Sequence, residues 1–167
     1  MAFDAVDGSF RGKYIRMHDY CHELLRSNPN STVKITSTPY VPSKSDLQDP
    51  TANLNTHFQR VYIFFKACKE SFLKCIPIIS LDGCFLKGYY GGKLLTAIGT
   101  DPNNKMFPIS YVVVDGETKE TWAWFLDLLV NDLGGPTRCG QYTFISDQQK
   151  VCLLLININT LHISHTQ

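Results

Sequence analysis

Apolar and polar positions along the chain follow two patterns, runs of strand length and stripes at helical spacing. Near the N-terminus, apolar residues between 14 and 25 recur every three or four positions, which is typical of an amphipathic helix. This pattern stops at Asn28-Pro29, where proline disfavours helix in the residue before it. We therefore predict a short helix, followed by a strand within residues 31–38.

The middle of the chain carries denser runs. Residues 58–75 begin with β-branched and aromatic residues and continue with helix-tolerant ones, which predicts a strand and then a short helix, although a single helix fits the same letters. The nearly continuous apolar run 76–81 predicts a strand covered on both faces. Runs 93–100 and 105–116 flank an Asp-Pro-Asn-Asn turn and should form a hairpin, in which Pro108 suits a strand start or an edge.

The most regular helical stripe lies in residues 118–135. Thr118 is a plausible N-cap, and Gly134-Gly135 can end the helix. The run 142–146 then predicts a short strand that ends at Asp147. Three strands, a helix and a further strand predict an α/β fold with a mixed sheet.

Composition narrows the class of protein. The 167 residues, 44% hydrophobic, suffice for one domain with a core, and a net charge of +1 indicates no global field for nucleic acid. There is no signal peptide pattern and no run long enough to span a bilayer, so we expect a soluble intracellular protein with no membrane partner. The six scattered cysteines are expected to be reduced thiols: Cys21, Cys68, Cys75, Cys84, Cys139 and Cys152.

Two aspartates carry the candidate chemistry. Asp82 and Asp147 each follow an apolar strand, and they would lie side by side if those strands are neighbours in the sheet. Two adjacent carboxylates repel unless a divalent cation lies between them, and Mg²⁺ or Mn²⁺ prefers such oxygen ligands. The alternative is that both are ordinary strand-end acids that accept hydrogen bonds from nearby amides. Spacing alone favours that alternative.

A family resemblance changes this balance. The segment "PIISLDGCFLKGYYGGKLLTAIGT", the following hairpin and helix, and "YTFISDQQK" resemble, in order and spacing, the catalytic domain of plant Mutator-like element (MULE) transposases. The resemblance is dense from Phe58 to Lys150 and extends to the segment that contains the first predicted helix. It implies an RNase H-like fold, a nuclear protein with DNA as its partner and no small-molecule substrate, and DNA strand cleavage and transfer by three acids with Mg²⁺ or Mn²⁺.

The same resemblance assigns roles to single residues. Asp82 matches the first metal-binding catalytic aspartate and Asp147 the second. Lys87 and Lys150 flank them and would suit DNA phosphates, although both also fit solvated surface lysines. His18 and His22 are four residues apart on the predicted helix, but two histidines without a third ligand are weak support for a metal site.

The end of the chain departs from the family pattern. The third acid of the family lies far downstream of the second, and the residues after Lys150 contain no Asp or Glu. We therefore expect an incomplete domain that is inactive or barely active. The chain divides into a helix-and-strand segment, a linker or long loop, a partial transposase domain and a divergent tail: residues 1–38, 39–56, 57–150 and 151–167.

Two other functions stay open from the sequence. The fold can serve as a DNA- or protein-binding regulator without catalysis, or the chain can be a fragment without a stable role. Association between copies of the chain is a further open point, because missing elements would leave part of the sheet uncovered.

Overall fold

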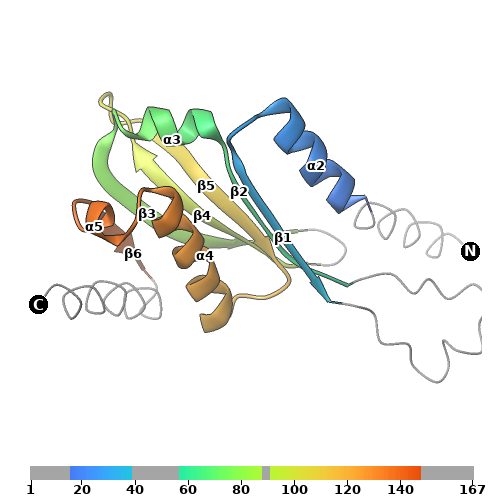
Figure 1. Cartoon of the computed structure of the whole chain (residues 1–167). Coiled ribbons are helices and arrows are strands. Elements are labelled where there is room, and N and C mark those ends of the chain that lie inside the picture. Colours follow the sequence, from blue (N-terminus) through green and yellow to red (C-terminus); the bar gives the residue numbers. More distant parts are fainter. Residues whose placement is uncertain (1–15, 39–56, 88–90, 148–167) are drawn as a thin grey trace, which may run out of the picture.

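The chain folds around one six-stranded sheet, with strand order β1-β2-β5-β4-β3-β6 (Figure 1). The structure, a computed structural model, describes residues 16–38, 57–87 and 91–147. Its elements are α2 (Met17–Ser27), β1 (Thr32–Thr38), β2 (His57–Phe64), α3 (Lys66–Phe72), β3 (Ile76–Phe85), β4 (Lys93–Thr100), β5 (Met106–Val114), α4 (Lys119–Asp132), α5 (Pro136–Cys139) and β6 (Thr143–Ser146).

The sheet is mixed. Strands β3, β4 and β5 form an antiparallel meander, and β2 and β1 extend it beyond β5, also antiparallel. Helix α4 then carries the chain across the sheet to β6, which pairs with β3 in parallel. The predicted α/β fold with a mixed sheet is confirmed, as is the order of three strands, a helix and a strand.

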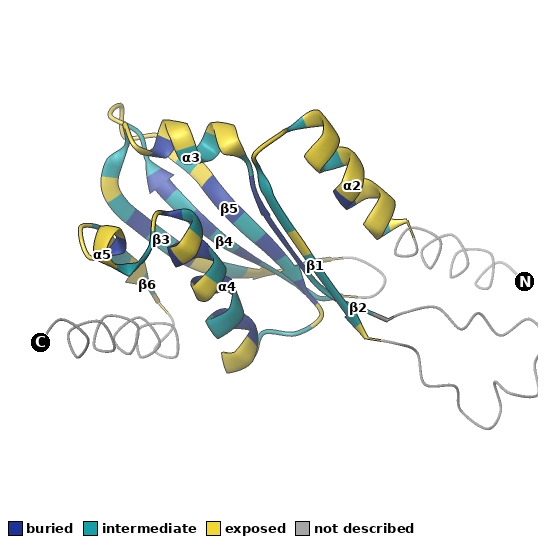
Figure 2. Cartoon of the chain, in the orientation of Figure 1, coloured by how far each residue is buried: buried dark blue, intermediate teal, exposed yellow. Residues whose placement is uncertain are grey.

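Helix α4 covers one face of the sheet and builds the main core. Its stripe of Trp122, Phe125, Leu126 and Leu129 is completely buried. The stripe packs on side chains from several strands, whose buried members include Tyr62, Phe64, Ile79, Leu81, Leu95, Ala97, Val112 and Val114. Figure 2 shows these buried positions on the strands behind α4. Removal of this apolar surface from water is the main contribution to the free energy that holds the helix on the sheet.

The opposite face is only partly covered. Helix α2 packs there through Cys21 against Val61 and Ile63 of β2, with Tyr111 and Val113 of β5 beside them. The pattern of apolar residues predicted this helix, and the structure confirms it as Met17–Ser27. Farther along the same face, β6 carries Ile145 with 52% of its surface exposed, so this half of the sheet is open in the part of the chain that is described.

Strand β3 differs from its prediction in two ways. It does not end at Asp82, because pairing with β4 continues to Phe85. Its side chains also alternate, with Ile79 and Leu81 buried beneath α4 and Asp82 exposed. The prediction of a strand covered on both faces is therefore wrong, since a run of apolar letters does not reveal how much cover its second face receives.

Local signals at α4 were interpreted correctly. Thr118 is the N-cap, and its side chain and that of Thr121 exchange hydrogen bonds with each other's backbone amides in a capping box. The helix ends before Gly134 and Gly135, whose φ angles of 101° and 88° favour glycine.

The predicted hairpin of β4 and β5 is confirmed. Asp101 holds its turn, because the carboxylate accepts the amides of Asn103 and Lys105 at 2.8 Å each. Pro108 lies at a register shift opposite Ile98, beyond the stretch of β5 that pairs with β2, so its missing amide costs no ladder bond to β2.

The N-terminal half joins the same sheet. The strand-then-helix interpretation of residues 58–75 is confirmed by β2 and α3, and the single-helix alternative is wrong. The predicted strand in 31–38 is β1, which pairs with β2. The predicted linker 39–56 lies outside the described residues, and the division of the chain at that point stays a prediction. Helix α5 was not predicted.

Candidate metal centre

Strands β3 and β6 bring the two candidate aspartates together. The parallel register runs from Ile78↔Thr143 to Leu81↔Ser146, so paired residues differ by 65 in number. Asp82 and Asp147 differ by the same number and are the next residues on the two strands. Neighbouring strands lie about 4.8 Å apart, so both carboxylates emerge at one place on the sheet. The two strands are thus neighbours, which is the condition under which the aspartates were expected to lie side by side.

Both aspartates are exposed, on the face opposite α4. Successive side chains of a strand point to opposite faces of the sheet. Leu81 and Phe144 pack into the core beneath α4, and Asp82 and Asp147 follow them by one and three positions, so both aspartates point away from α4. One oxygen of Asp82, Oδ1, accepts the backbone amide of Gly83 at 2.7 Å. This contact is of the kind expected for an ordinary strand-end acid, and it also fixes the rotation of the carboxylate.

The residues fit part of the coordination shell of a divalent cation. Carboxylate oxygens are the ligands that Mg²⁺ and Mn²⁺ prefer, and Mg²⁺ takes about six ligands, several of which are usually water. Across the described ranges, no three His, Cys, Asp or Glu side chains gather into a metal-binding group. Asp82 and Asp147 would therefore supply two protein ligands, with the remaining positions open to water or phosphate oxygen.

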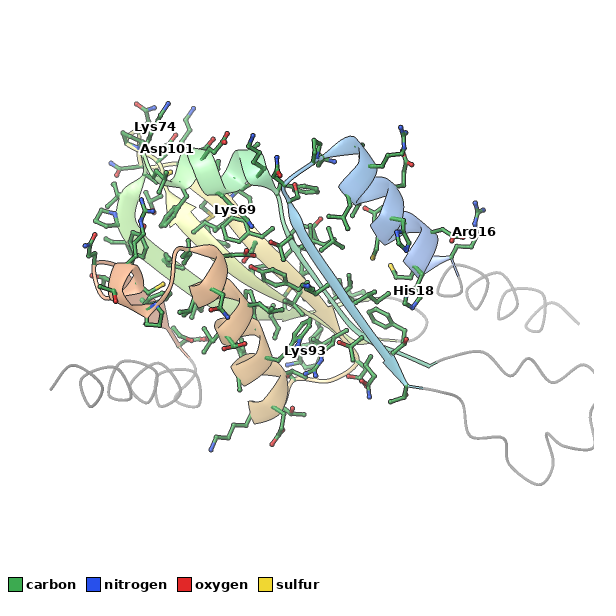
Figure 3. All side chains as sticks on the ribbon, in the orientation of Figure 1. Arg16, His18, Lys69, Lys74, Lys93 and Asp101 are labelled. Atoms are coloured by element: carbon green, nitrogen blue, oxygen red, sulfur yellow. The ribbon has the colours of Figure 1, made fainter. Side chains whose placement is uncertain are left out.

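A second polar cluster lies directly behind Asp82, on the α4 face of the sheet. Glu117, just before the N-cap of α4, forms an ion pair with Lys93 of β4 and accepts the indole N–H of Trp122 at 3.0 Å. The Lys93 ammonium also lies 3.8 Å from the ring centroid of Phe85, at the end of β3. In Figure 3, Lys93 lies near the beginning of α4. No sequence motif indicated this cluster, because its members are far apart in the chain.

A third polar cluster lies at the other end of α4. Asp132 accepts hydrogen bonds from Thr32 and Lys69 at 2.7 Å each and from the Tyr62 hydroxyl at 2.9 Å. Burial, and then the negative charge of Asp132, raise the pKa of Tyr62 far above its usual value, so the hydroxyl stays protonated and donates. The cluster joins α4 to β1, β2 and α3.

The other residues near the site have simpler positions. Lys87 is exposed, two residues beyond the end of β3. Lys150 lies outside the described residues. Gly91 and Gly92 have φ angles of 64° and 96°, and a Cβ on Gly92 would lie 2.8 Å from the carbonyl oxygen of Val114, so these glycines serve backbone geometry. His18 contacts Ser37 of β1, with its ring nitrogen 3.4 Å from the hydroxyl oxygen.

The two tryptophans are packing residues. Trp122 is completely buried in the core. Trp124 is partly buried and packs against the edge of the core, where the guanidinium of Arg60 in β2 lies 4.4 Å from its ring centroid. Its edge also contacts Tyr62 in a T-shaped pair, so Trp124 is occupied by intramolecular contacts.

Comparison with known protein families identifies the domain. Residues 78–166 match the MULE transposase domain, and this range contains both aspartates, the β4–β5 hairpin, α4 and β6. The match covers more than half of the chain, so the chain belongs to the MULE transposase domain family. No curated protein and no solved structure matches the chain.

The bounds of the family match add two facts. The match extends to residue 166 and thus includes most of the tail that the sequence set apart as divergent. It begins inside β3, so α2, β1, β2 and α3 lie before it although they share its sheet and core. Among the helices that the structure describes, none is long and apolar enough to cross a membrane.

Proposed function

We propose that this chain is a transposase-derived protein with an RNase H-like catalytic core, in which Asp82 and Asp147 hold Mg²⁺ or Mn²⁺ beside a DNA phosphodiester. The observation that supports this most is the parallel register of β3 and β6, which brings these two residues to adjacent strand positions. The family match and the β5-β4-β3-β6 order, with a helix between the antiparallel meander and the parallel strand, support the same assignment.

The chemistry follows from the residues themselves. A bound divalent cation supplies a Lewis acid for a phosphate oxygen and lowers the pKa of a bound water. Asp82 and Asp147 would hold the cation, and the bond from the Gly83 amide would orient the Asp82 carboxylate. Lys87 is exposed beyond β3 and would contact a neighbouring phosphate, which adds affinity without sequence preference. A DNA partner would place the protein in the nucleus.

The 167-residue chain by itself is expected to cleave DNA little or not at all. Two carboxylates leave most of the coordination shell to water, and residues 148–167 contain no Asp or Glu that would add a third. Weak cation binding should therefore be measurable where cleavage is not.

Binding of Mn²⁺ tests the proposal most directly. Titration with Mn²⁺ should broaden the amide NMR signals of residues 81–83 and 146–147 before others, and Asp82→Asn or Asp147→Asn should abolish this selective broadening. Asp127→Asn is the matched control, since Asp127 is an exposed acid on α4. Broadening that is equal in the wild type and in Asp82→Asn would refute the metal site.

A DNA measurement separates the remaining alternative, a binding module without catalysis. Nicking of supercoiled plasmid in Mn²⁺ should stay near background for the wild type, and strong nicking that is lost in Asp82→Asn would overturn the expectation of weak activity. Salt-dependent binding of duplex DNA that is unchanged in both aspartate variants and without metal would favour the binding module.

A further inference from the structure

We propose that Glu117 is the positioning residue of Asp82: from the other side of the sheet it fixes the backbone that carries the first metal-binding carboxylate. This inference rests on the proposed function, because it takes Asp82 as a cation ligand. Nothing in the sequence motifs points to Glu117, which lies in the loop between β5 and α4.

The first step is how firmly Glu117 itself is held. Its side chain is only 11% exposed and forms an ion pair with Lys93, whose side chain is 19% exposed. Its Oε1 accepts the N–H of Trp122, which is completely buried. The ion pair and the indole donor hold the Glu117 carboxylate in place, because loss of either partner at this largely buried position is costly.

The second step is the contact between Glu117 and the residue after Asp82. A Cβ on Gly83 would lie 3.5 Å from Oε1 of Glu117 and 3.1 Å from Cδ2 of Leu95, so the Glu117 carboxylate packs against the backbone of Gly83. The amide of this same Gly83 donates to Oδ1 of Asp82. Glu117 therefore supports the one backbone unit that orients the Asp82 carboxylate.

The third step is why Asp82 needs this support. The paired register of β3 and β6 ends at Leu81↔Ser146, one residue before the aspartates, and Asp82 itself is exposed. Beyond Leu81, β3 is held by its pairing with β4, and Phe85 at its end is 76% exposed. Lys93 is the register partner of Phe85. Its ammonium lies over the Phe85 ring and also pairs with Glu117, so these contacts connect the end of β3 to the start of α4.

Glu117 is not itself a cation ligand in this assignment. It lies on the α4 face, whereas Asp82 points to the opposite face, and Lys93 neutralises its charge. Its role is comparable to that of outer carboxylates that orient metal ligands, whose removal typically lowers metal affinity about 10- to 100-fold.

The test compares Glu117→Gln with Asp132→Asn. Both replace a half-buried carboxylate that pairs with a lysine at one end of α4, so both should lower stability in urea unfolding. Only Glu117→Gln should weaken the selective Mn²⁺ broadening at residues 81–83, by about 10-fold in affinity. Equal weakening in Asp132→Asn, or wild-type affinity in Glu117→Gln, would overturn the proposal.

A measurement without metal separates this inference from the proposed function. Glu117→Gln should speed amide hydrogen exchange at Gly83, where the amide is bound to Asp82, and Asp132→Asn should leave that rate unchanged. Faster exchange at Gly83 together with no Mn²⁺ binding by the wild type would retain the structural link and reject the metal site. Unchanged exchange at Gly83 would reject the positioning role, whatever the metal result. Lys93→Met removes the charge and should reduce the protection of the Gly83 amide against exchange. Lys93→Arg keeps the charge and should retain most of that protection.

Discussion

At the scale of single residues, Asp132 shows how a half-buried charge can be satisfied. It lies in the last turn of α4, where the negative end of the helix dipole disfavours an acid, yet Lys69, Thr32 and Tyr62 all donate to it. Asp132→Ala would leave a lysine and a buried hydroxyl without this partner, so we expect the free energy of unfolding to fall by about 3 kcal/mol. Urea unfolding measures the loss. Glu23→Ala removes an exposed pair with Arg26 and should change little, and equal losses in the two variants would contradict this account.

The cysteines differ in their expected reactivity. Burial raises the pKa of the Cys139 thiol to about 11, whereas Cys84 is exposed on β3. In the native protein at pH 8, DTNB should therefore modify Cys84 quickly and Cys139 only after unfolding. Because Cys139 titrates higher in the native state than in the unfolded state, its contribution to stability is complete below about pH 9 and is lost as the pH rises towards 11. Cys139→Ser removes that alkaline loss, and an unchanged pH profile in this variant would contradict the assignment.

At the scale of elements, the start of α4 matters because Glu117 immediately precedes its N-cap. In the capping box, the Thr118 hydroxyl accepts the Thr121 amide at 3.2 Å. Thr118→Ala should cost about 1 kcal/mol in thermal or urea unfolding, since it leaves a helix amide without its partner. Thr118→Ser keeps the oxygen and should retain most of that stability. If serine destabilises as much as alanine, the hydroxyl is not the stabilising group.

Most elements could be predicted because their signals are local. The stripe of α4 with Thr118 and two terminal glycines, and the turn around Asp101, each depend on residues within a few positions of one another. The full length of β3 could not be predicted, because residues after Asp82 are held by β4 rather than by their own apolarity. Helix α5 is a single turn and leaves no periodic pattern.

The candidate site divides in the same way. Asp82 and Asp147 could be found from the sequence because each follows an apolar run, and their proximity needed only the assumption that the two strands are neighbours. Glu117 and Lys93 could not be found, since their partnership depends on how α4 begins above the sheet. Residues that a strand presents directly are visible in a sequence pattern, whereas those that support them from another layer depend on tertiary contacts.

At the scale of the whole molecule, the folding unit is larger than the region that matches the family. Tyr62, Phe64 and Phe72 lie before residue 78, and all three are at most 2% exposed in the core beneath α4. A chain of residues 78–167 would lack them and would leave β5 without its β2 neighbour. Loss of one large core side chain typically costs about 3–5 kcal/mol, so loss of three costs about 9–15 kcal/mol, which is comparable to the whole stability of about 5–15 kcal/mol expected for a domain.

We therefore predict that residues 78–167 alone do not unfold cooperatively and bind ANS, whereas residues 16–147 retain a cooperative transition. Circular dichroism during urea titration, with ANS fluorescence in parallel, checks both. The longer piece is the control, because it keeps every element that the structure describes, from α2 to β6. A sharp transition for residues 78–167 would show that the α4 core closes without β2 and α3. In that case the N-terminal elements would be an accessory layer, and variants of Asp132 should destabilise the longer piece only, because Thr32, Tyr62 and Lys69 are missing from the shorter one.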